Sequence, residues 1–207
     1  MNLHGTPVHY FRPSYDTKGR FNSYWHQIDE VISLAPRQVL EVGVGNGFVA
    51  NYLKERGIDV KTLDIDHRLC PDIIGSVLEI PFENEVFDVV SCCEVLEHLP
   101  YSELKNALRE LARVSQKFVI LSLPDVTTSY RFNIELPRLK PIKKLVLHPF
   151  HRAIRHEFDS EHYWEIGKIS YALKKIIKDL QSSGFEIVKT YRVFEFRYNR
   201  FFSLRKI

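Results

Sequence analysis

The sequence predicts an α/β fold built on a doubly wound, mostly parallel sheet. Between Val39 and Pro124, short apolar runs alternate with helical patterns, which is typical of parallel strands joined by crossover helices. The first apolar run ends in a glycine-rich turn, and the second ends at an acidic residue, Asp64. At 207 residues, 44% of them hydrophobic, the chain can bury one sizeable core, so we expect residues 1–207 to form a single domain.

The individual elements follow from periodicity and from turn residues. Helices are expected at 48–56, 101–114 and 168–182, where apolar side chains recur at helical spacing. Strands are expected at 38–42, 60–63, 72–75, 87–92, 118–123, 186–194 and 200–206. Residues 126–166 show no clean period. We therefore expect a substrate-side insert there, functional or partly helical lid material.

The glycine-rich turn predicts an adenosine-containing cofactor. Its spacing is Gly43-x-Gly45-x-Gly47, whereas the dinucleotide fingerprint is G-x-G-x-x-G, and Phe48 stands where a small residue would be needed. Glycines let the backbone approach a ligand, and the N-terminus of the following helix favours a carboxylate. Asp64 lies 17 residues past Gly47, where its carboxylate would accept the ribose hydroxyls. A nicotinamide oxidoreductase is a remote alternative.

Five segments in order resemble the motifs of class I S-adenosylmethionine-dependent methyltransferases, most closely the ubiquinone-biosynthesis-like branch that acts on small molecules. They are Val39–Gly47, Leu63–Asp66, Leu78–Phe82, Phe87–Val90 and Glu94–Leu99. The resemblance covers roughly residues 38–125 and implies a seven-stranded sheet with an antiparallel last strand. It also implies that the N-terminal segment 1–37 covers the cofactor, where Tyr24 or Trp25 would lie against the sulfonium or else pack under the sheet.

The resemblance implies a cofactor site for S-adenosyl-L-methionine. The turn with Glu41, Gly43, Gly45 and Gly47 would hold the methionine part of this cofactor. Asp64 would bind the ribose, with Asp66 as the fallback, and Ile65 would pack on the adenine. Ser76 stands where the family often has an acid that binds the adenine amino group, and the backbone of Val77 lies beside it. Cys93 and Glu94 would lie beside the transferring methyl group.

Methyl transfer from a sulfonium needs an aligned acceptor and, for a hydroxyl, a base. The candidate catalytic residues are His98, His156 and His162, although His98 also suits a purely structural role at a helix start. Glu94, Glu97 and His98 resemble the E-x-x-E-H metal ligands of certain RNA 3′-end 2′-O-methyltransferases. We expect no metal, because the same tract is widespread in metal-free methyltransferases and the histidine spacing fits no standard zinc pattern.

Charge is distributed unevenly along the chain. Residues 1–125 hold 12 Lys/Arg against 18 Asp/Glu, and residues 126–207 hold 17 against 8. Within 131–156 there are seven basic residues and one acid, Glu135. A small anionic, phosphorylated or lipid-linked acceptor is favoured, with a membrane-surface contact or RNA as alternatives. A solvated basic surface explains the charge equally well.

The sequence also predicts a cytoplasmic protein. It has no transmembrane segment, nothing resembling a signal peptide, and three cysteines that form no disulfide or zinc pattern. It favours no oligomeric state. A protein that binds S-adenosylmethionine without catalysis is the main alternative from another functional class, and RNA methylation is the main alternative within the enzymes.

Overall fold

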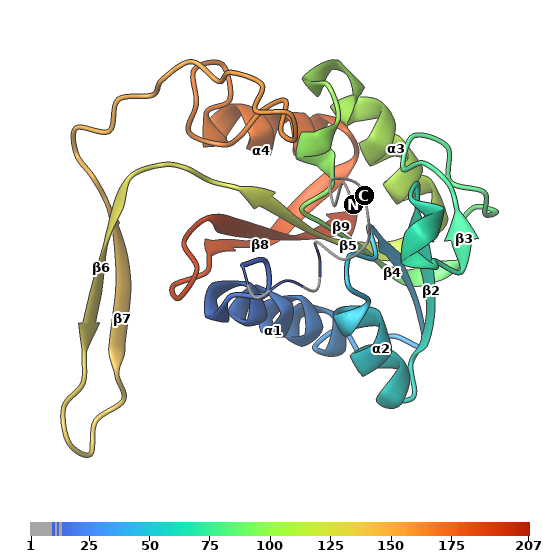
Figure 1. Cartoon of the computed structure of the whole chain (residues 1–207), viewed down its shortest axis with the longest axis horizontal. Helices are drawn as coiled ribbons and strands as arrows, with labels where there is room; N and C mark the ends of the chain where they lie inside the picture. Colours follow the sequence, from blue (N-terminus) through green and yellow to red (C-terminus); the bar gives the residue numbers. More distant parts are fainter. Residues whose placement is uncertain (1–9, 11, 13) are drawn as a thin grey trace.

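The computed structural model describes residues 10, 12 and 14–207, and its centre is a seven-stranded sheet (Figure 1). The strand order is β3-β2-β1-β4-β5-β9-β8. The parallel strands are β1 (Gln38–Val42), β2 (Asp59–Asp64), β3 (Ile73–Ile74), β4 (Phe87–Cys93) and β5 (Ser115–Pro124). The last strand, β9 (Asn199–Lys206), lies between β5 and β8 (Phe185–Arg192) and is antiparallel to both. The predicted seven-stranded sheet with an antiparallel last strand is confirmed.

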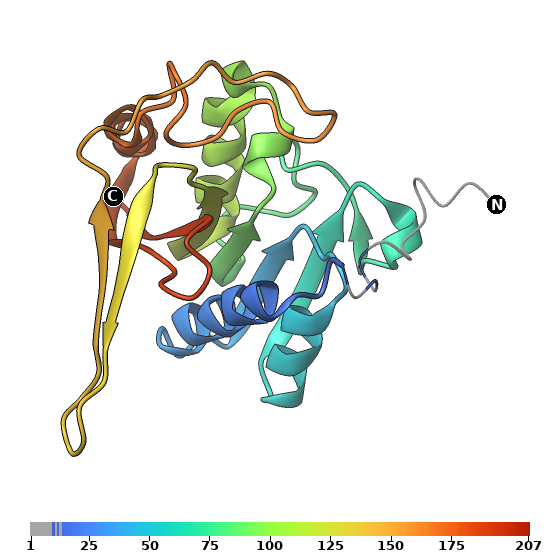
Figure 2. The same cartoon turned by 60° about the vertical axis from the view of Figure 1, so that its left-hand side comes forward.

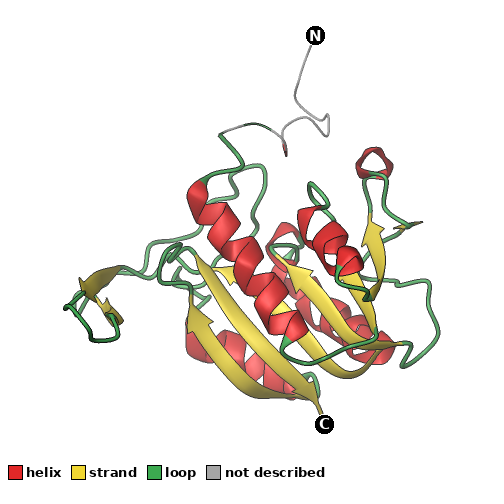
Figure 3. Ribbon diagram, turned by 90° about the horizontal axis from the view of Figure 1, so that it is seen from below, coloured by secondary structure: helices red, strands yellow, loops and turns green. Residues whose placement is uncertain are grey.

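Helices cover both faces of the sheet (Figures 1 and 3). Helices α1 (Lys18–Ile32) and α2 (Phe48–Glu55) share one buried cluster with Val39 of β1 and Ile120 of β5. Helices α3 (Leu104–Val114) and α4 (Leu173–Ser182) share another with Leu40 and Leu121. Neighbouring residues of one strand thus face opposite layers, as the two-residue period of a strand requires. This is why β1 and β5 carry buried apolar residues on both faces of the sheet.

Helix α4 begins later than the sequence predicts, at Leu173 and not at residue 168. Gly167 and Ser170 have φ values of +95° and +72°, a left-handed backbone that cannot continue a right-handed helix. The predicted helix over 101–114 likewise divides into a 3₁₀ turn at Tyr101–Glu103 followed by α3.

The expectation of a partly helical lid over 126–166 was wrong in its secondary structure. The described chain has no helix there and instead forms an antiparallel hairpin of β6 (Ser129–Ile134) and β7 (Ile142–Leu147). This hairpin projects away from the body of the protein (Figures 1 and 2). The local alternation of Tyr130, Phe132 and Ile134 with polar residues is the period of a strand, and it is short enough to be overlooked in a proline-rich stretch.

A buried ion cluster fixes the place where the chain leaves β5 for the hairpin. Asp125 is 1% exposed, and its carboxylate lies 2.7 Å from Nε of Arg200 and 3.7 Å from Nε of Arg192. Arg192 also donates to the carbonyl oxygens of Asp125 and Thr127, at 2.9 and 2.7 Å. Buried charges therefore help to hold the root of the hairpin.

In the described part of the chain, none of the helices combines the length and the apolar character that crossing a lipid bilayer requires. The cytoplasmic location stays a prediction.

We predict that Asp125→Ala lowers the free energy of unfolding by about 3–5 kcal/mol, because it leaves two buried guanidinium groups without their carboxylate. Glu186→Ala is the matched control, since it removes the exposed ion pair with Arg205 and should cost less than about 1 kcal/mol. Urea unfolding of the three proteins measures both effects. Equal stability of the two variants would contradict the role given to Asp125.

Candidate active site

The predicted cofactor residues meet at one edge of the sheet. Strands β1, β2 and β4 are parallel neighbours, so their carboxyl ends lie side by side. The turn that follows β1, the aspartate that ends β2 and the loop that follows β4 therefore come together. This edge is where open α/β sheets bind their ligands.

Glycine is required in the turn after β1 for two separate reasons. Gly43, Gly45 and Gly47 all have positive φ values, of 84°, 52° and 71°. Only glycine adopts this backbone without strain at three positions so close together. In addition, a Cβ atom at Gly43 would lie 2.3 Å from Cγ2 of Val95. The turn is thus pressed against the loop that follows β4.

Asp64 is held in a fixed orientation by backbone groups. Its Oδ2 accepts a hydrogen bond from the N–H of Val44, and its Oδ1 accepts one from the N–H of Asp66, both at 2.9 Å. Each oxygen keeps a further lone pair for another donor. The fallback residue, Asp66, is engaged with Arg68 through two side-chain hydrogen bonds of 2.7 and 2.6 Å, and these lower its pKa to about 2. Between the two acids, Asp64 is better placed to accept ribose hydroxyls.

The residues predicted around adenine lie in two environments. Ile65 is 75% exposed beside Asp64, so its side chain is available to a ligand. Ser76 uses its Oγ to accept the N–H of Leu78 at 3.1 Å, and Val77 is buried. The hydroxyl of Ser76 thus helps to shape this loop and keeps its own O–H as a donor.

Glu41 lies behind the turn, buried in the sheet. Burial raises the pKa of its carboxyl group to about 8, the N–H of Ala50 opposes this shift, and the charge of Asp64 adds to it. Its Oε2 has no hydrogen-bond partner among the described residues. The Glu41 carboxyl group is therefore readily protonated near neutral pH.

Two aromatic residues that the sequence analysis did not single out lie over the turn. A Cβ atom at Gly45 would lie 3.9 Å from the ring of Tyr10, and the rings of Tyr10 and Tyr15 meet edge to face at 5.0 Å. The guanidinium of Arg20 stands 4.2 Å from the ring centre of Tyr15. The clustering of Tyr10, Phe11 and Tyr15 before α1 was the signal that could have found them.

Of the two aromatic residues predicted for this place, Tyr24 packs beside the turn, and its hydroxyl lies 3.4 Å from the Asp16 carboxylate oxygen that also accepts from Asn46. Tyr24 is buried with its ring stacked on Phe48 at 5.4 Å, and Trp25 is 58% exposed with its ring edge against His26. The described start of the predicted covering segment is anchored to the turn, since Asn46 donates to Asp16 at 3.1 Å. Residues 1–9, 11 and 13 of that segment lie outside the described residues.

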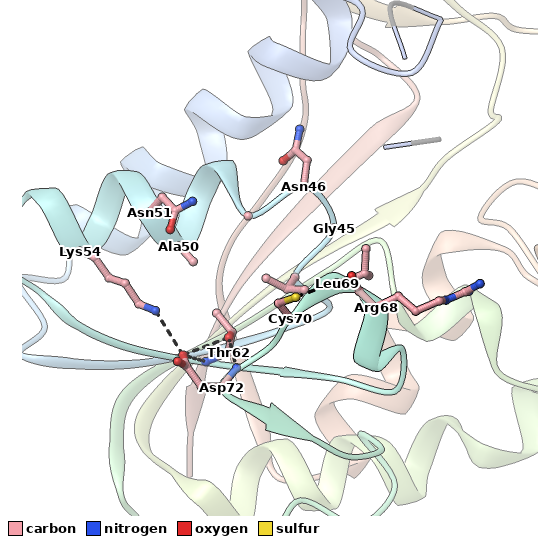
Figure 4. A pocket seen from close by; sticks show the side chains of 12 residues that line it. Gly45, Asn46, Ala50, Asn51, Lys54, Thr62, Arg68, Leu69, Cys70 and Asp72 are labelled. Atoms are coloured by element: carbon pink, nitrogen blue, oxygen red, sulfur yellow. Dashed lines mark hydrogen bonds and ion pairs between the residues drawn. The ribbon is translucent and has the colours of Figure 1, made fainter. Parts of the chain in front are cut away.

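A cavity of about 390 Å³ opens on the outer flank of the turn, between α2 and β2 (Figure 4). Gly45 and Gly47 line it, but Asp64, Val77 and Glu94 do not. Its charged groups are already paired, because Asp72 accepts from Lys54 at 3.2 Å and from the hydroxyl of Thr62 at 3.0 Å. This cavity adjoins the candidate site without containing it.

The loop after β4 brings a thiol and a carboxyl group to the same edge. Burial raises the pKa of Cys93 to about 12 and also raises that of its neighbour Cys92 well above its ordinary value, so neither is a thiolate nucleophile at neutral pH. Glu94 has a left-handed backbone, with φ +55°, and its Oε1 accepts the hydroxyl of Ser122 at 2.8 Å. Burial also raises the pKa of Glu94.

Beyond Glu94, the loop after β4 contacts residues 161–164, which lie far away in the sequence. The N–H of Tyr163 donates to the carbonyl of Glu97 at 2.8 Å, and the indole of Trp164 donates to the carbonyl of Leu99 at 3.2 Å. These bonds bring the rings of His98 and His162 to within 4.9 Å of each other.

The three candidate catalytic histidines differ in their surroundings. Partial desolvation lowers the pKa of His98, whereas hydrogen bonding to Glu165 raises that of His162. The side chain of His156 is 6% exposed, and its Nε2 bonds to the carbonyl of His162. His156 thus lies behind His162, so the geometry disfavours it as a base that meets an acceptor.

The proteins that this chain resembles support the fold described above and the assignment of the glycine-rich turn. Residues 40–121, from β1 to β5, match the model of the family described as "Methyltransferase domain". This match supports the resemblance to class I S-adenosylmethionine-dependent methyltransferases that the sequence motifs indicate. Among curated proteins, this chain is 36% identical over 90 residues to a ubiquinone biosynthesis O-methyltransferase of Stutzerimonas stutzeri, and 35% identical over 88 residues to that of Pseudomonas entomophila. Each match covers 35% of this chain and 38% of the relative, so the chain spans about two fifths of their length.

Solved structures share the fold of this chain at low identity. The magnesium protoporphyrin IX methyltransferase of Synechocystis, with bound SAM, has a TM-score of 0.63 and 17% identity, over 98% of this chain and 92% of that one. The 1,6-didemethyltoxoflavin-N1-methyltransferase of Burkholderia thailandensis has a TM-score of 0.61 and 13% identity, over 97% and 86%.

The thiols provide a test of the site's electrostatics. At pH 8 we predict that one cysteine, the exposed Cys70, reacts rapidly with a thiol reagent, while Cys92 and Cys93 react only on unfolding. Thiolate is the reactive form, so labelling of Cys93 should increase only as the pH approaches about 12. Cys70→Ser should abolish the rapid phase. Two rapid thiols in the native protein would contradict this account.

Proposed function

We propose that this methyltransferase domain binds S-adenosylmethionine along the carboxyl edge of β1, β2 and β4 and transfers its methyl group to an oxygen or nitrogen atom of a small acceptor. The observation that carries the proposal is the orientation of Asp64, whose carboxylate is fixed by the turn it would share with the cofactor. In this arrangement the turn 43–47 holds the methionine part of the donor, and Ile65 and Val77 flank the adenine.

The reaction is an in-line displacement. An acceptor lone pair forms the new bond to the methyl carbon while the carbon–sulfur bond breaks, and its electron pair stays on the sulfur as a thioether. The protein's task is alignment, since the leaving group is already activated. Cys93, the last residue of β4, and Glu94, which follows it, would lie nearest to the methyl group, and a hydroxyl proton would leave towards His98 and His162.

An oxygen acceptor carried on a lipid is the finer proposal. The curated relatives are O-methyltransferases of ubiquinone biosynthesis. The hairpin adds support from this chain itself, because it leaves the sheet directly after β5, the strand whose Ser122 contacts Glu94.

One face of the hairpin is apolar and uncovered. Paired residues of β6 and β7 point to the same side, and successive residues alternate. The side chains of one face, each 42–58% exposed apart from one lysine, are Tyr130, Phe132, Ile134, Ile142 and Val146 together with Lys144. We call this set the apolar hairpin face.

The opposite face of the hairpin is turned to the protein. Arg131 donates to the carbonyl of Glu195 at 3.3 Å, and Lys143 pairs with the Glu195 carboxylate at 2.7 Å. An uncovered apolar face with Lys140 and Lys144 nearby suits an anionic lipid surface, where aromatic and aliphatic groups enter the interface and lysines meet the headgroups. We propose this surface as the place where the enzyme meets its acceptor.

RNA methylation and cofactor binding without catalysis are the alternatives. Incubation of the protein with cell extract and methyl-labelled S-adenosylmethionine separates them. A labelled lipid or small molecule supports the proposal, and a labelled RNA would replace it. Binding of S-adenosylhomocysteine with no labelled product in any fraction would favour the non-catalytic protein.

We predict that Asp64→Ala weakens the binding of S-adenosylhomocysteine at least roughly tenfold, since a hydrogen bond to a charged group contributes about 1.5–3 kcal/mol. Asp66→Ala is the matched control and should have a much smaller effect, because Asp66 is engaged with Arg68. Isothermal titration calorimetry measures both. Unchanged affinity in Asp64→Ala would contradict the proposed site.

The apolar hairpin face gives a second prediction. The native protein should sediment with vesicles of phosphatidylglycerol and phosphatidylcholine, and binding should fall roughly fivefold for each of Lys140→Ala and Lys144→Ala, since a basic residue near such a surface contributes about 1 kcal/mol. The double variant Phe132→Ser/Ile142→Ser should also release the protein.

Val188→Ser is the control, because Val188 is a comparably exposed apolar residue on β8, away from the hairpin. Equal binding of the double variant and the control would contradict the lipid surface. If the double variant instead abolished a dimer seen by sedimentation, the face would belong to a second copy of the chain.

A further inference from the structure

Three side chains from two separate segments form a hydrogen-bonded triad beside the loop after β4. The hydroxyl of Tyr198 donates to Oε1 of Glu165 at 2.6 Å. Nδ1 of His162 lies 3.3 Å from the same carboxylate oxygen and 3.2 Å from the hydroxyl oxygen of Tyr198. The sequence predicts His162 as a site residue, but it predicts neither of the two partners.

The backbone of Asp125 brings these two partners together. Its N–H donates to the carbonyl of Tyr198 at 2.6 Å, and the residue forms a parallel bridge with Ile166, which follows Glu165. Trp164 and Ile166, on either side of Glu165, are both 0% exposed. The positions of Glu165 and Tyr198 are thus set by backbone contacts and burial of their own segments.

The loop between β8 and β9, residues 193–198, is also seated on helix α1. The ring of Phe196 lies so close to Gly19 that a Cβ atom there would be 2.5 Å from Cδ2 of the ring. Glycine at this position therefore lets the ring pack directly on the helix backbone. Tyr198 follows two residues later, on a loop that is anchored at both ends.

The hydrogen-bond geometry determines which ring nitrogen of His162 carries the proton. Tyr198 has one hydroxyl proton, and the 2.6 Å distance assigns it to Glu165. Hydrogen bonds from His162 and Tyr198, together with the charge of Lys168, lower the pKa of Glu165 against the effect of burial, so this carboxylate only accepts. Nδ1 of His162 thus faces two acceptors and carries the proton. Nε2 keeps its lone pair, and none of the described residues bonds to it.

The neighbouring His98 has the same tautomer with weaker support. Its Nδ1 lies 2.9 Å from the carbonyl oxygen of Glu161, which can only accept. A carbonyl stabilises a protonated ring less than a carboxylate does. Desolvation accordingly lowers the pKa of His98, whereas the hydrogen bond to Glu165 raises that of His162. Of the two rings, which lie 4.9 Å apart, His162 is the better proton acceptor.

Other titratable groups surround the ring of His162. The charges of Asp159 and Glu94 add to the rise of its pKa, and burial opposes this rise. Burial raises the pKa of the adjacent Glu97 well above its ordinary value, so this acid is uncharged at neutral pH. The carbonyl of His162 accepts from Nε2 of His156 at 2.8 Å, which supports the backbone of the same residue.

We propose that Glu165 and Tyr198 are positioning residues, which hold His162 with its proton on Nδ1 and so present Nε2 to a hydroxyl group of the acceptor. This inference rests on the proposed function and narrows the acceptor atom to oxygen. The hydroxyl proton passes to Nε2, an oxygen lone pair forms the bond to the methyl carbon, and the carbon–sulfur electron pair stays on sulfur. The resulting imidazolium faces the Glu165 carboxylate and later releases its proton to solvent.

The tautomer is measured on the protein without cofactor or acceptor. Long-range proton–nitrogen NMR spectra of protein with isotope-labelled histidine report it, and the signals of His162 are those lost in His162→Gln. In the neutral ring, reached at alkaline pH, the native protein should carry the proton on Nδ1. In Glu165→Met the hydroxyl proton of Tyr198 is free to be donated to Nδ1, so the ring proton should move to Nε2.

Turnover is measured with methyl-labelled S-adenosylmethionine and the extract fraction that contains the acceptor. In Tyr198→Phe and in Glu165→Met, kcat should fall roughly tenfold or more, since each variant loses a hydrogen bond to a charged group. KM for S-adenosylmethionine and the affinity for S-adenosylhomocysteine should not change. Tyr191→Phe is the matched control and should keep native turnover, because Tyr191 likewise contacts a glutamate, Glu30, at 2.8 Å and Nδ1 of a histidine, His26, at 3.1 Å.

Two results would overturn the proposal. One is a proton on Nε2 of neutral His162 in the native protein, which decides the matter even if Glu165→Met does not fold. The other is equal turnover of Tyr198→Phe and Tyr191→Phe. Failure of the native protein to bind S-adenosylhomocysteine would instead refute the proposed function, and the tautomer would still decide whether Glu165 and Tyr198 position the ring.

Discussion

The two hydrogen bonds that fix the Asp64 carboxylate connect the elements on which the site depends. One comes from Val44 in the turn after β1 and the other from Asp66 beyond β2. They hold the glycine-rich turn against the end of the second strand, where the turn also donates from Gly43 to the carbonyl of Leu63 at 2.8 Å. A carboxylate placed in this way needs no rearrangement to accept two hydroxyl groups, which reduces the cost of binding.

The acceptor side is organised by a second set of contacts, between the loop after β4 and residues 156–165. The backbone N–H of Tyr163, the ring Nδ1 of His98 and the buried indole of Trp164 each bond to a carbonyl oxygen of the facing segment. The donor edge and the histidine cluster are therefore neighbours in space, because both are built on the end of β4. The hairpin root at Asp125 follows the adjacent strand, so that a surface-bound acceptor would arrive at the same edge of the sheet.

Much of the fold could be predicted, because strands buried on both faces and helices with one apolar face leave clear patterns in the sequence. The turn and Asp64 belong to short motifs whose residues lie close together in the chain. The proximity of His98 and His162, 64 positions apart, depends on a long loop without periodicity, and local spacing gave no sign of it. Tyr10 and Tyr15 were missed because aromatic residues before a helix have no fixed pattern.

The central claim is that Asp64 and the turn 43–47 together hold the donor. A crystal structure of the protein with S-adenosylhomocysteine tests this claim most directly. The account predicts both ribose hydroxyls within hydrogen-bond distance of the Asp64 carboxylate, and the amino-acid end of the ligand against the glycine turn. A ligand bound in the cavity beside Lys54 and Asp72, with its ribose away from Asp64, would contradict it.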